Sequence, residues 1–128
     1  MKRYLGKLNK SHIETALSEQ QIGLGVMLTV VGVTGDAHKN NSTDENHVLM
    51  PPSNTRQWAL ELARDVKEMI NAGVDVQYVE IWNEPDMPSE WDDTKEKFAN
   101  FFAECGSVLR SELPANVKIG GPGMASGW

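Results

Sequence analysis

The sequence predicts an α/β fold in which parallel strands alternate with amphipathic helices. Short apolar runs rich in β-branched residues alternate with segments whose apolar residues recur at helical spacing. Polar, Gly- or Pro-rich loops follow the carboxyl ends of the expected strands. Strands separated in this way by helices pair in parallel through right-handed crossovers. An open doubly wound sheet and a section of a (β/α)8 barrel both fit, and periodicity alone does not decide between them.

The first two elements are expected before residue 34. Ser11 and Glu14 have the spacing of a capping box, which predicts a helix start there. The short helix would then carry an apolar face of Ile13, Ala16 and Leu17. Residues 22–33 form an almost continuous apolar run, and this composition predicts a strand covered on both faces.

A polar stretch of about 20 residues follows, over 34–53, and a loop of that length is either functional or mobile. His38 and His47 lie in it together with acidic residues. No tight spacing of metal ligands is present, so a solvated loop is favoured over a metal site and no metal is expected.

The second half of the chain continues the alternation of helices and strands. A second helix is predicted by apolar residues at helical spacing, with Gly73 just beyond its end: Trp58, Leu62, Val66, Met69 and Ile70. Residues 76–82 are the next expected strand, which stops at Asn83-Glu84-Pro85 because proline cannot continue a central ladder. We expect Trp58 and Trp82 to lie in the core.

A third helix and a last strand complete the pattern. The helix would end at Pro114, and one face of it carries Phe98, Phe101, Phe102, Cys105, Val108 and Leu109. Residues 117–120 start the strand, and the Gly-Pro-Gly at 121–123 breaks it.

Composition narrows the class of protein. The chain has 128 residues, enough for one domain with a hydrophobic core. Its net charge of −6 argues against a nucleic-acid partner. Cys105 is the single cysteine, so it forms no internal disulfide and is expected in the core. No signal peptide or membrane span of roughly 18 apolar residues is apparent, and the cytoplasm is the default compartment.

Glu84 is the strongest candidate for chemistry. It follows the apolar strand at the expected mouth of the sheet, between a carboxamide and a proline. Partial desolvation would raise the pKa of such a carboxyl, which could then hold a proton near neutral pH and give it to a leaving oxygen. On composition alone, a residue that simply caps a loop remains the favoured alternative.

Residues 78–86, Tyr-Val-Glu-Ile-Trp-Asn-Glu-Pro-Asp, resemble the end of the fourth barrel strand in clan A glycoside hydrolases. The surrounding chain, from about residue 22 to the C-terminus, is most similar to family 39, the β-xylosidase and α-L-iduronidase group. Further similar stretches are Pro51-Pro52 before Trp58, Met87-Pro88 with Trp91, the Phe-rich helix, and residues 118–122. The resemblance implies a partial (β/α)8 TIM barrel, roughly from its second helix to its fifth strand. Residues 1–128 would then be a single fragment of a glycosidase catalytic domain.

The resemblance also implies roles for individual residues. Glu84 would be the acid/base of a retaining glycosidase, and Asn83 would hydrogen-bond the sugar 2-hydroxyl. Trp91 would either present a flat apolar face to a sugar or anchor its loop. The role of Trp128, at the end of the chain, is left open. The implied substrate is a carbohydrate, with β-xylosides the leading guess, and no cofactor is implied because protonation and carboxylate attack need none.

A retaining glycosidase also needs a nucleophilic carboxylate, about 5–5.5 Å from the acid/base. In the family this residue follows the seventh strand, so the nucleophile is not expected in this chain. None of the other nearby acids matches that position: Glu80, Asp86, Glu90, Asp92 and Asp93. Glu80 would share a face with Glu84 only if the strand stayed regular through Asn83.

A partial barrel leaves two open sheet edges, so self-association or pairing with a complementary barrel portion is expected. No membrane partner is expected. One alternative is a non-catalytic carbohydrate-binding or interaction module. Another is an unrelated α/β domain in which Asn-Glu-Pro is accidental.

Overall fold

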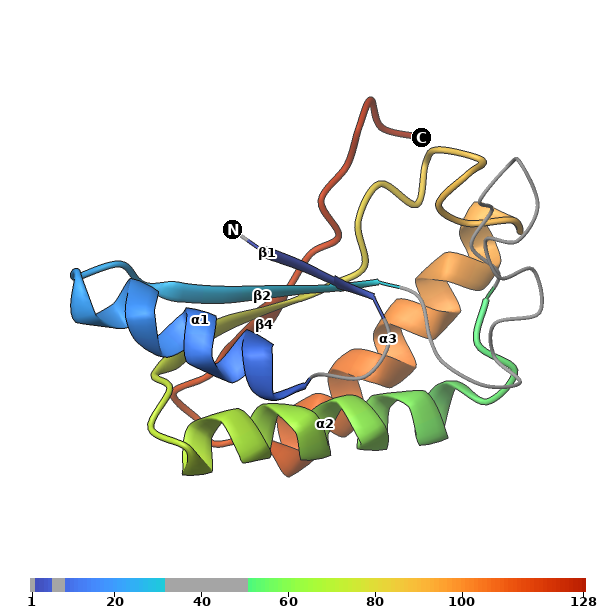
Figure 1. The fold of residues 1–128 in the computed structure, drawn as a ribbon. Helices are drawn as coiled ribbons and strands as arrows, with labels where there is room; N and C mark the ends of the chain where they lie inside the picture. The colour runs from blue at the N-terminus through green and yellow to red at the C-terminus, as the bar shows by residue number, and fades with distance from the viewer. Residues whose placement is uncertain (1, 6–8, 32–50) are drawn as a thin grey trace.

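The computed structural model describes residues 2–5, 9–31 and 51–128, which form a four-stranded parallel sheet and three helices (Figure 1). The strands are β1 (Lys2–Leu5), β2 (Val26–Val31), β3 (Val76–Ile81) and β4 (Lys118–Gly120), and they pair in chain order. The helices α1 (Lys10–Gln21), α2 (Thr55–Asn71) and α3 (Lys95–Glu112) all lie on one face of the sheet (Figure 1). The predicted α/β fold with parallel strands is therefore confirmed.

The N-terminal part differs from the prediction in two ways. The sequence does not predict β1, because four residues are too few to show a periodicity. The predicted helix start at Ser11 is wrong, since Asn9 is the N-cap of α1. The Asn9 side chain accepts a hydrogen bond from the His12 backbone N–H at 3.2 Å, and His12 Nδ1 accepts one from the Asn9 N–H at 3.1 Å. A histidine thus completes the capping box in place of Glu14.

The remaining elements match the sequence pattern closely. The predicted strand over 22–33 begins later than expected, at Val26, while Ile22 caps the end of α1 and is exposed. Residues 32 and 33 lie outside the described part of the chain. Within β2 only Met27 is partly exposed, so the strand is covered on both faces as expected. The predicted helices α2 and α3 and the strands β3 and β4 are confirmed.

The hydrophobic core fills the layer between the sheet and the helices. From the sheet, Leu28 and Val30 of β2 lie in register with Val79 and Ile81 of β3, and all four are buried. From the helices, the buried apolar residues besides Trp58 are Ala16, Ala59, Leu62, Ala63, Val66, Met69, Phe98, Phe101, Cys105, Val108 and Leu109. Trp58 and Trp82 belong to the same core, as predicted.

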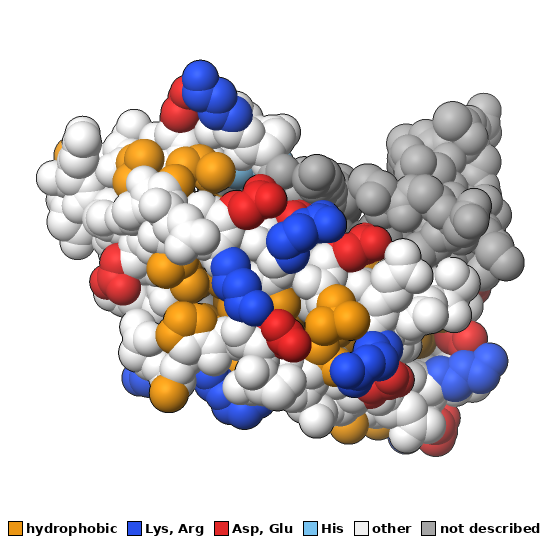
Figure 2. Space-filling model, turned by 90° about the horizontal axis from the view of Figure 1, so that it is seen from below, with side chains coloured by type: hydrophobic (Ala, Val, Ile, Leu, Met, Phe, Trp, Pro, Cys, Tyr) orange, Lys and Arg blue, Asp and Glu red, His pale blue; other side chains and the backbone are white. Residues whose placement is uncertain are grey.

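The face seen in Figure 2 carries charged side chains of both signs, interspersed with hydrophobic and uncharged ones. Lys67 of α2 and Glu112 of α3 form an ion pair at 2.8 Å that joins the two helices. Such exposed pairs add little to stability, about 0–1 kcal/mol. Among the residues that the structure describes, no helix has the length and apolar character needed to cross a membrane.

We expect Cys105 to be unreactive in the folded protein. Its thiol is fully buried in α3, and burial raises the pKa of Cys105. The thiolate is the reactive form, so both access and ionisation are suppressed. A disulfide exchange reagent should react with Cys105 only as fast as the chain unfolds, and quickly once denaturant is added. Equal rates with and without denaturant would contradict this packing.

Candidate functional site

Strand β3 ends in an irregular turn in which two residues have left-handed backbone angles. Trp82 has a φ of 71° and Glu84 a φ of 49°. This region is unfavourable for bulky residues, at a cost on the order of 1–3 kcal/mol each. Burial holds Trp82 there: its ring is fully covered, and its Nε1 donates to the Glu90 carbonyl at 2.7 Å. The regular alternation of side chains therefore ends at Ile81, and Glu80 and Glu84 are not related by strand periodicity.

The chain after β4 continues the sheet alongside this turn. Asn83 bridges Gly123 in parallel, and the Glu84 N–H donates to the Gly123 carbonyl at 2.5 Å. Gly121 has a φ of 107°, and a Cβ there would lie 2.9 Å from Glu80 Cγ. Glycine is thus required at 121 for both conformation and space.

Glu80 lies on the face of the sheet that carries no helix. Its neighbours Val79 and Ile81 point into the core, so Glu80 points the other way. Thr29, its register partner on β2, is buried and donates its hydroxyl to Glu80 Oε2 at 2.5 Å. A charge-assisted bond of this length fixes the carboxylate. The other oxygen, Oε1, lies 3.2 Å from the position that a Cβ at Gly123 would occupy.

Asn83 and Glu84 lie at the carboxyl end of β3, where the sequence predicts them. Both are half-buried. The backbone of Glu84 is held on each side, since its carbonyl also accepts the Met87 N–H at 2.9 Å. Among the described residues, none donates a hydrogen bond to the Glu84 carboxylate or pairs with it. Hydrogen bonds thus fix the backbone that carries the Glu84 carboxyl group.

The packing of Trp91 fits the second of its two predicted roles, the loop anchor, and its sugar contact stays a prediction. Its side chain is 3% exposed, and its ring packs 5.3 Å from Trp82 and 5.0 Å from Phe98, between ring centroids. Its Nε1 donates to the Thr94 carbonyl at 3.1 Å. A ring covered to this extent can anchor the loop after β3. Trp128 is half exposed and packs 5.6 Å from Phe98.

Asp86 is a site residue whose role the sequence does not predict. It accepts hydrogen bonds from the backbone N–H groups of Ala125, Ser126 and Gly127, at 3.0, 2.7 and 2.7 Å. The Ser126 hydroxyl donates to it as well, at 3.2 Å. These donors hold the pKa of Asp86 well below its usual range. The donors are mostly backbone amides 39 to 41 residues away, so no pattern of residue types reveals the contact.

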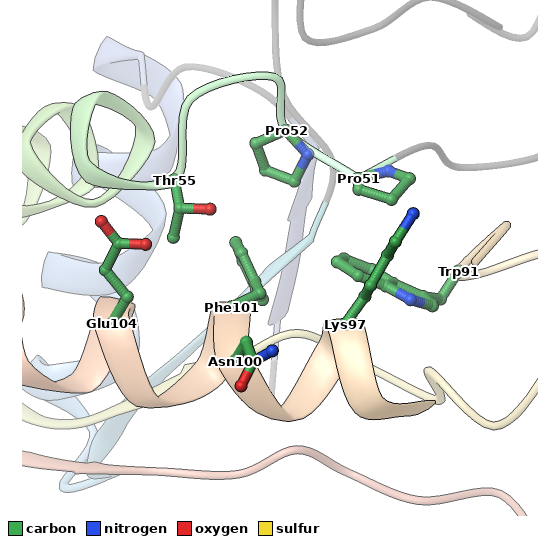
Figure 3. A pocket seen from close by; sticks show the side chains of 8 residues that line it. All are labelled: Pro51, Pro52, Thr55, Trp91, Lys97, Asn100, Phe101 and Glu104. Atoms are coloured by element: carbon green, nitrogen blue, oxygen red, sulfur yellow. The ribbon is translucent and has the colours of Figure 1, made fainter. Parts of the chain in front are cut away.

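A pocket of about 210 Å³ opens beside α3, apart from Asn83 and Glu84 (Figure 3). Its lining comprises Pro51, Pro52, Thr55, Trp91, Lys97, Asn100, Phe101 and Glu104. The described ranges contain no group of three or more side chains that could hold a metal ion. His38 and His47 lie outside these ranges.

Comparison with known proteins gives no assignment. No family model matches the chain, and no curated protein matches it.

Replacing Glu84 by Asn should stabilise the fold. Asn adopts left-handed angles more readily than Glu, so we expect the free energy of unfolding to rise by about 1 kcal/mol. Glu68→Asn, at an exposed position of α2, is the matched control and should lower it by a few tenths because Asn is the poorer helix former. Urea unfolding of both variants checks the opposite signs. A loss of stability in Glu84→Asn would show that the backbone at 84 is not strained.

Proposed function

We propose that this chain carries the acid/base part of a retaining glycoside hydrolase that cleaves O-glycosyl bonds, with β-xylosides as the leading substrate class. Glu84 is the proton donor and Asn83 the partner of the sugar 2-hydroxyl. The observation that carries the proposal is the pair of left-handed residues, Trp82 and Glu84, around Asn83 at the end of β3. Backbone strain held in place by packing is typical of active sites. The Asn-Glu-Pro resemblance assigns the chemistry.

The arrangement of the elements supports a section of a (β/α)8 barrel. The four strands follow one another in chain order, and the three helices lie on one face (Figure 1). A doubly wound sheet reverses its strand order and covers both faces. Barrel enzymes carry their catalytic groups at the carboxyl ends of the strands, as Asn83 and Glu84 do here. In this proposal β1 to β4 correspond to the second to fifth barrel strands.

In the proposed reaction Glu84 gives its proton to the leaving oxygen as the bond to the anomeric carbon breaks. As a carboxylate it then removes a proton from the water that releases the sugar. The nucleophile would be a second carboxylate about 5–5.5 Å away. We assign none in this chain. Asp86 is unsuited to the role, because its oxygens are engaged by four hydrogen bonds.

A carbohydrate-binding module without catalysis is the second candidate. The lack of an assigned nucleophile favours it, since Asn83 and Glu84 could bind a sugar without cleaving it. Under either function, we propose that the outer edges of β1 and β4 pair with strands of another copy or of a complementary barrel portion.

An affinity label tests the acid/base assignment without requiring a nucleophile in the chain. A β-xyloside whose aglycone carries an epoxide alkylates the carboxyl group beside the leaving oxygen. We expect one adduct, mapped to Glu84 by mass spectrometry and suppressed by excess xylobiose. Glu84→Gln should abolish it, whereas Glu96→Gln, at an exposed position of α3, should not. Adducts spread over exposed carboxylates and insensitive to xylobiose would overturn the proposal.

Hydrolysis separates the two candidates. Turnover of aryl and alkyl β-xylosides that is lost in Glu84→Gln would favour the enzyme. The alkyl xylosides are the more stringent probe, because a poor leaving group depends more on the proton donor. Labelling of Glu84 without any turnover would favour the binding module.

A further inference from the structure

Two hydrogen-bond acceptors, from Glu80 and Asn83, lie close to the Cα atom of Gly123. A Cβ built on Gly123 would lie 3.2 Å from Glu80 Oε1 and 3.5 Å from Asn83 Oδ1. The backbone angle of Gly123 is ordinary, so its lack of a side chain matters here because it lets the Glu80 and Asn83 side chains approach the backbone closely. The two oxygens come from residues on either side of the irregular turn in β3, and the turn is what brings them together.

Neither oxygen is satisfied by the described part of the protein. Thr29 donates to the other carboxylate oxygen, Oε2, and thereby fixes the direction of Oε1. No described residue donates to Glu80 Oε1 or to Asn83 Oδ1. Both side chains are half-buried, so water or a ligand can supply the donors. A ligand that replaces this water would bring two neighbouring donors and no negative charge.

We propose that Glu80 and Asn83 form a subsite for two adjacent hydroxyl groups of a sugar, with Glu80 as a residue that determines specificity. The inference rests on the proposed function and deepens it. Asn83 accepts from the 2-hydroxyl, and Glu80 Oε1 accepts from the neighbouring 3-hydroxyl beside Gly123. Both protons stay on the sugar.

The test compares the binding of methyl β-xyloside with that of its 3-deoxy analogue, by titration calorimetry or NMR. Wild type should bind the 3-deoxy sugar about tenfold more weakly, because one charge-assisted hydrogen bond is lost. Glu80→Gln keeps an acceptor for Thr29 and should weaken binding of the parent sugar about tenfold. The same variant should bind the 3-deoxy sugar as wild type does.

Glycine variants test the position of the Glu80 carboxylate. Gly123→Ala would place a methyl group 3.2 Å from Glu80 Oε1, displace that oxygen and weaken binding of the parent sugar tenfold or more. Gly120→Ala is the matched control on β4, since a Cβ there meets no atom within 4 Å, and its binding should not change. Circular dichroism and the melting temperature check that each variant is folded. Glu80→Gln tests the subsite independently if Gly123→Ala folds poorly.

The outcomes separate this inference from the proposed function. If Glu84 is labelled as expected but Glu80→Gln binds the parent sugar as tightly as wild type, the subsite is wrong and the proposed function stands. If Glu80→Gln weakens both sugars equally, Glu80 acts only through the structure, and the specificity role is overturned. If folded wild type neither binds the sugar nor reacts with the label, both proposals fail.

Discussion

Trp82→Ala is expected to lower the free energy of unfolding by about 3–5 kcal/mol, a large share of the total for a single domain. The Trp82 ring is fully buried and lies among three other aromatic rings, 5.9 Å from Trp58, 5.3 Å from Trp91 and 5.4 Å from Phe101. Alanine would leave a cavity between the sheet and both longer helices. It would also leave the left-handed backbone at 82 in place, so no relief of strain offsets the loss. Urea unfolding followed by circular dichroism measures the change.

Two further variants show what the Trp82 side chain contributes. Trp82→Phe keeps most of the apolar contact but loses the donor to the Glu90 carbonyl, so we expect a smaller loss of about 1–3 kcal/mol. Trp128→Ala removes a half-exposed ring at the edge of the same cluster, and we expect it to cost well under half as much as Trp82→Ala. Equal unfolding midpoints for Trp82→Ala and Trp128→Ala would show that Trp82 does not organise the core.

Asp86→Ala is expected to release the segment after β4 from the loop after β3. The backbone N–H groups of Ala125, Ser126 and Gly127 all donate to Asp86, and they should exchange with solvent much faster in the variant. Amide exchange followed by NMR measures this directly. Asp92→Ala, at an exposed position of the same loop, is the matched control and should leave these three amides protected. Unchanged protection in Asp86→Ala would show that other contacts hold the segment.

The same contact has a defined pH dependence. Folding lowers the pKa of Asp86, so its carboxylate stabilises the folded loop fully above the ordinary carboxyl pKa of about 3.9. This contribution is lost as the pH falls through the depressed pKa of the folded state. The difference in amide protection between wild type and Asp86→Asn should therefore be full at about pH 5 to 7 and shrink only in strong acid. A difference that vanished above pH 5 would contradict the lowered pKa.

Most of the fold can be predicted from the sequence, because its longer elements carry strong periodic patterns. The helices α2 and α3 show apolar residues at helical spacing over several turns, and β3 is a short run rich in apolar residues that stops before a proline. The N-terminal elements are harder to predict. β1 is too short to show a period. The capping box of α1 is formed by Asn9 and His12, a pair that common capping patterns do not include.

The candidate site can be predicted in its location but not in its conformation. Asn83 and Glu84 follow an apolar strand and precede a proline, which places them at the mouth of the sheet. The left-handed angles of Trp82 and Glu84 arise from tertiary packing, including the hydrogen bond from Trp82 to the Glu90 carbonyl. Local residue preferences therefore do not predict them. The same holds for Glu80, whose carboxylate is directed by Thr29 from another strand, 51 residues away.

The chain-order sheet also bears on how this protein assembles during its synthesis. Each strand pairs only with its predecessor and successor, so β2 meets β1, and β3 meets β2, as soon as it leaves the ribosome. At a translation rate of roughly 5–20 residues per second, each new strand emerges within several seconds of the strand with which it pairs. No strand has to insert between two that are already paired. Vectorial synthesis therefore never requires the growing chain to break a pairing that it has already made.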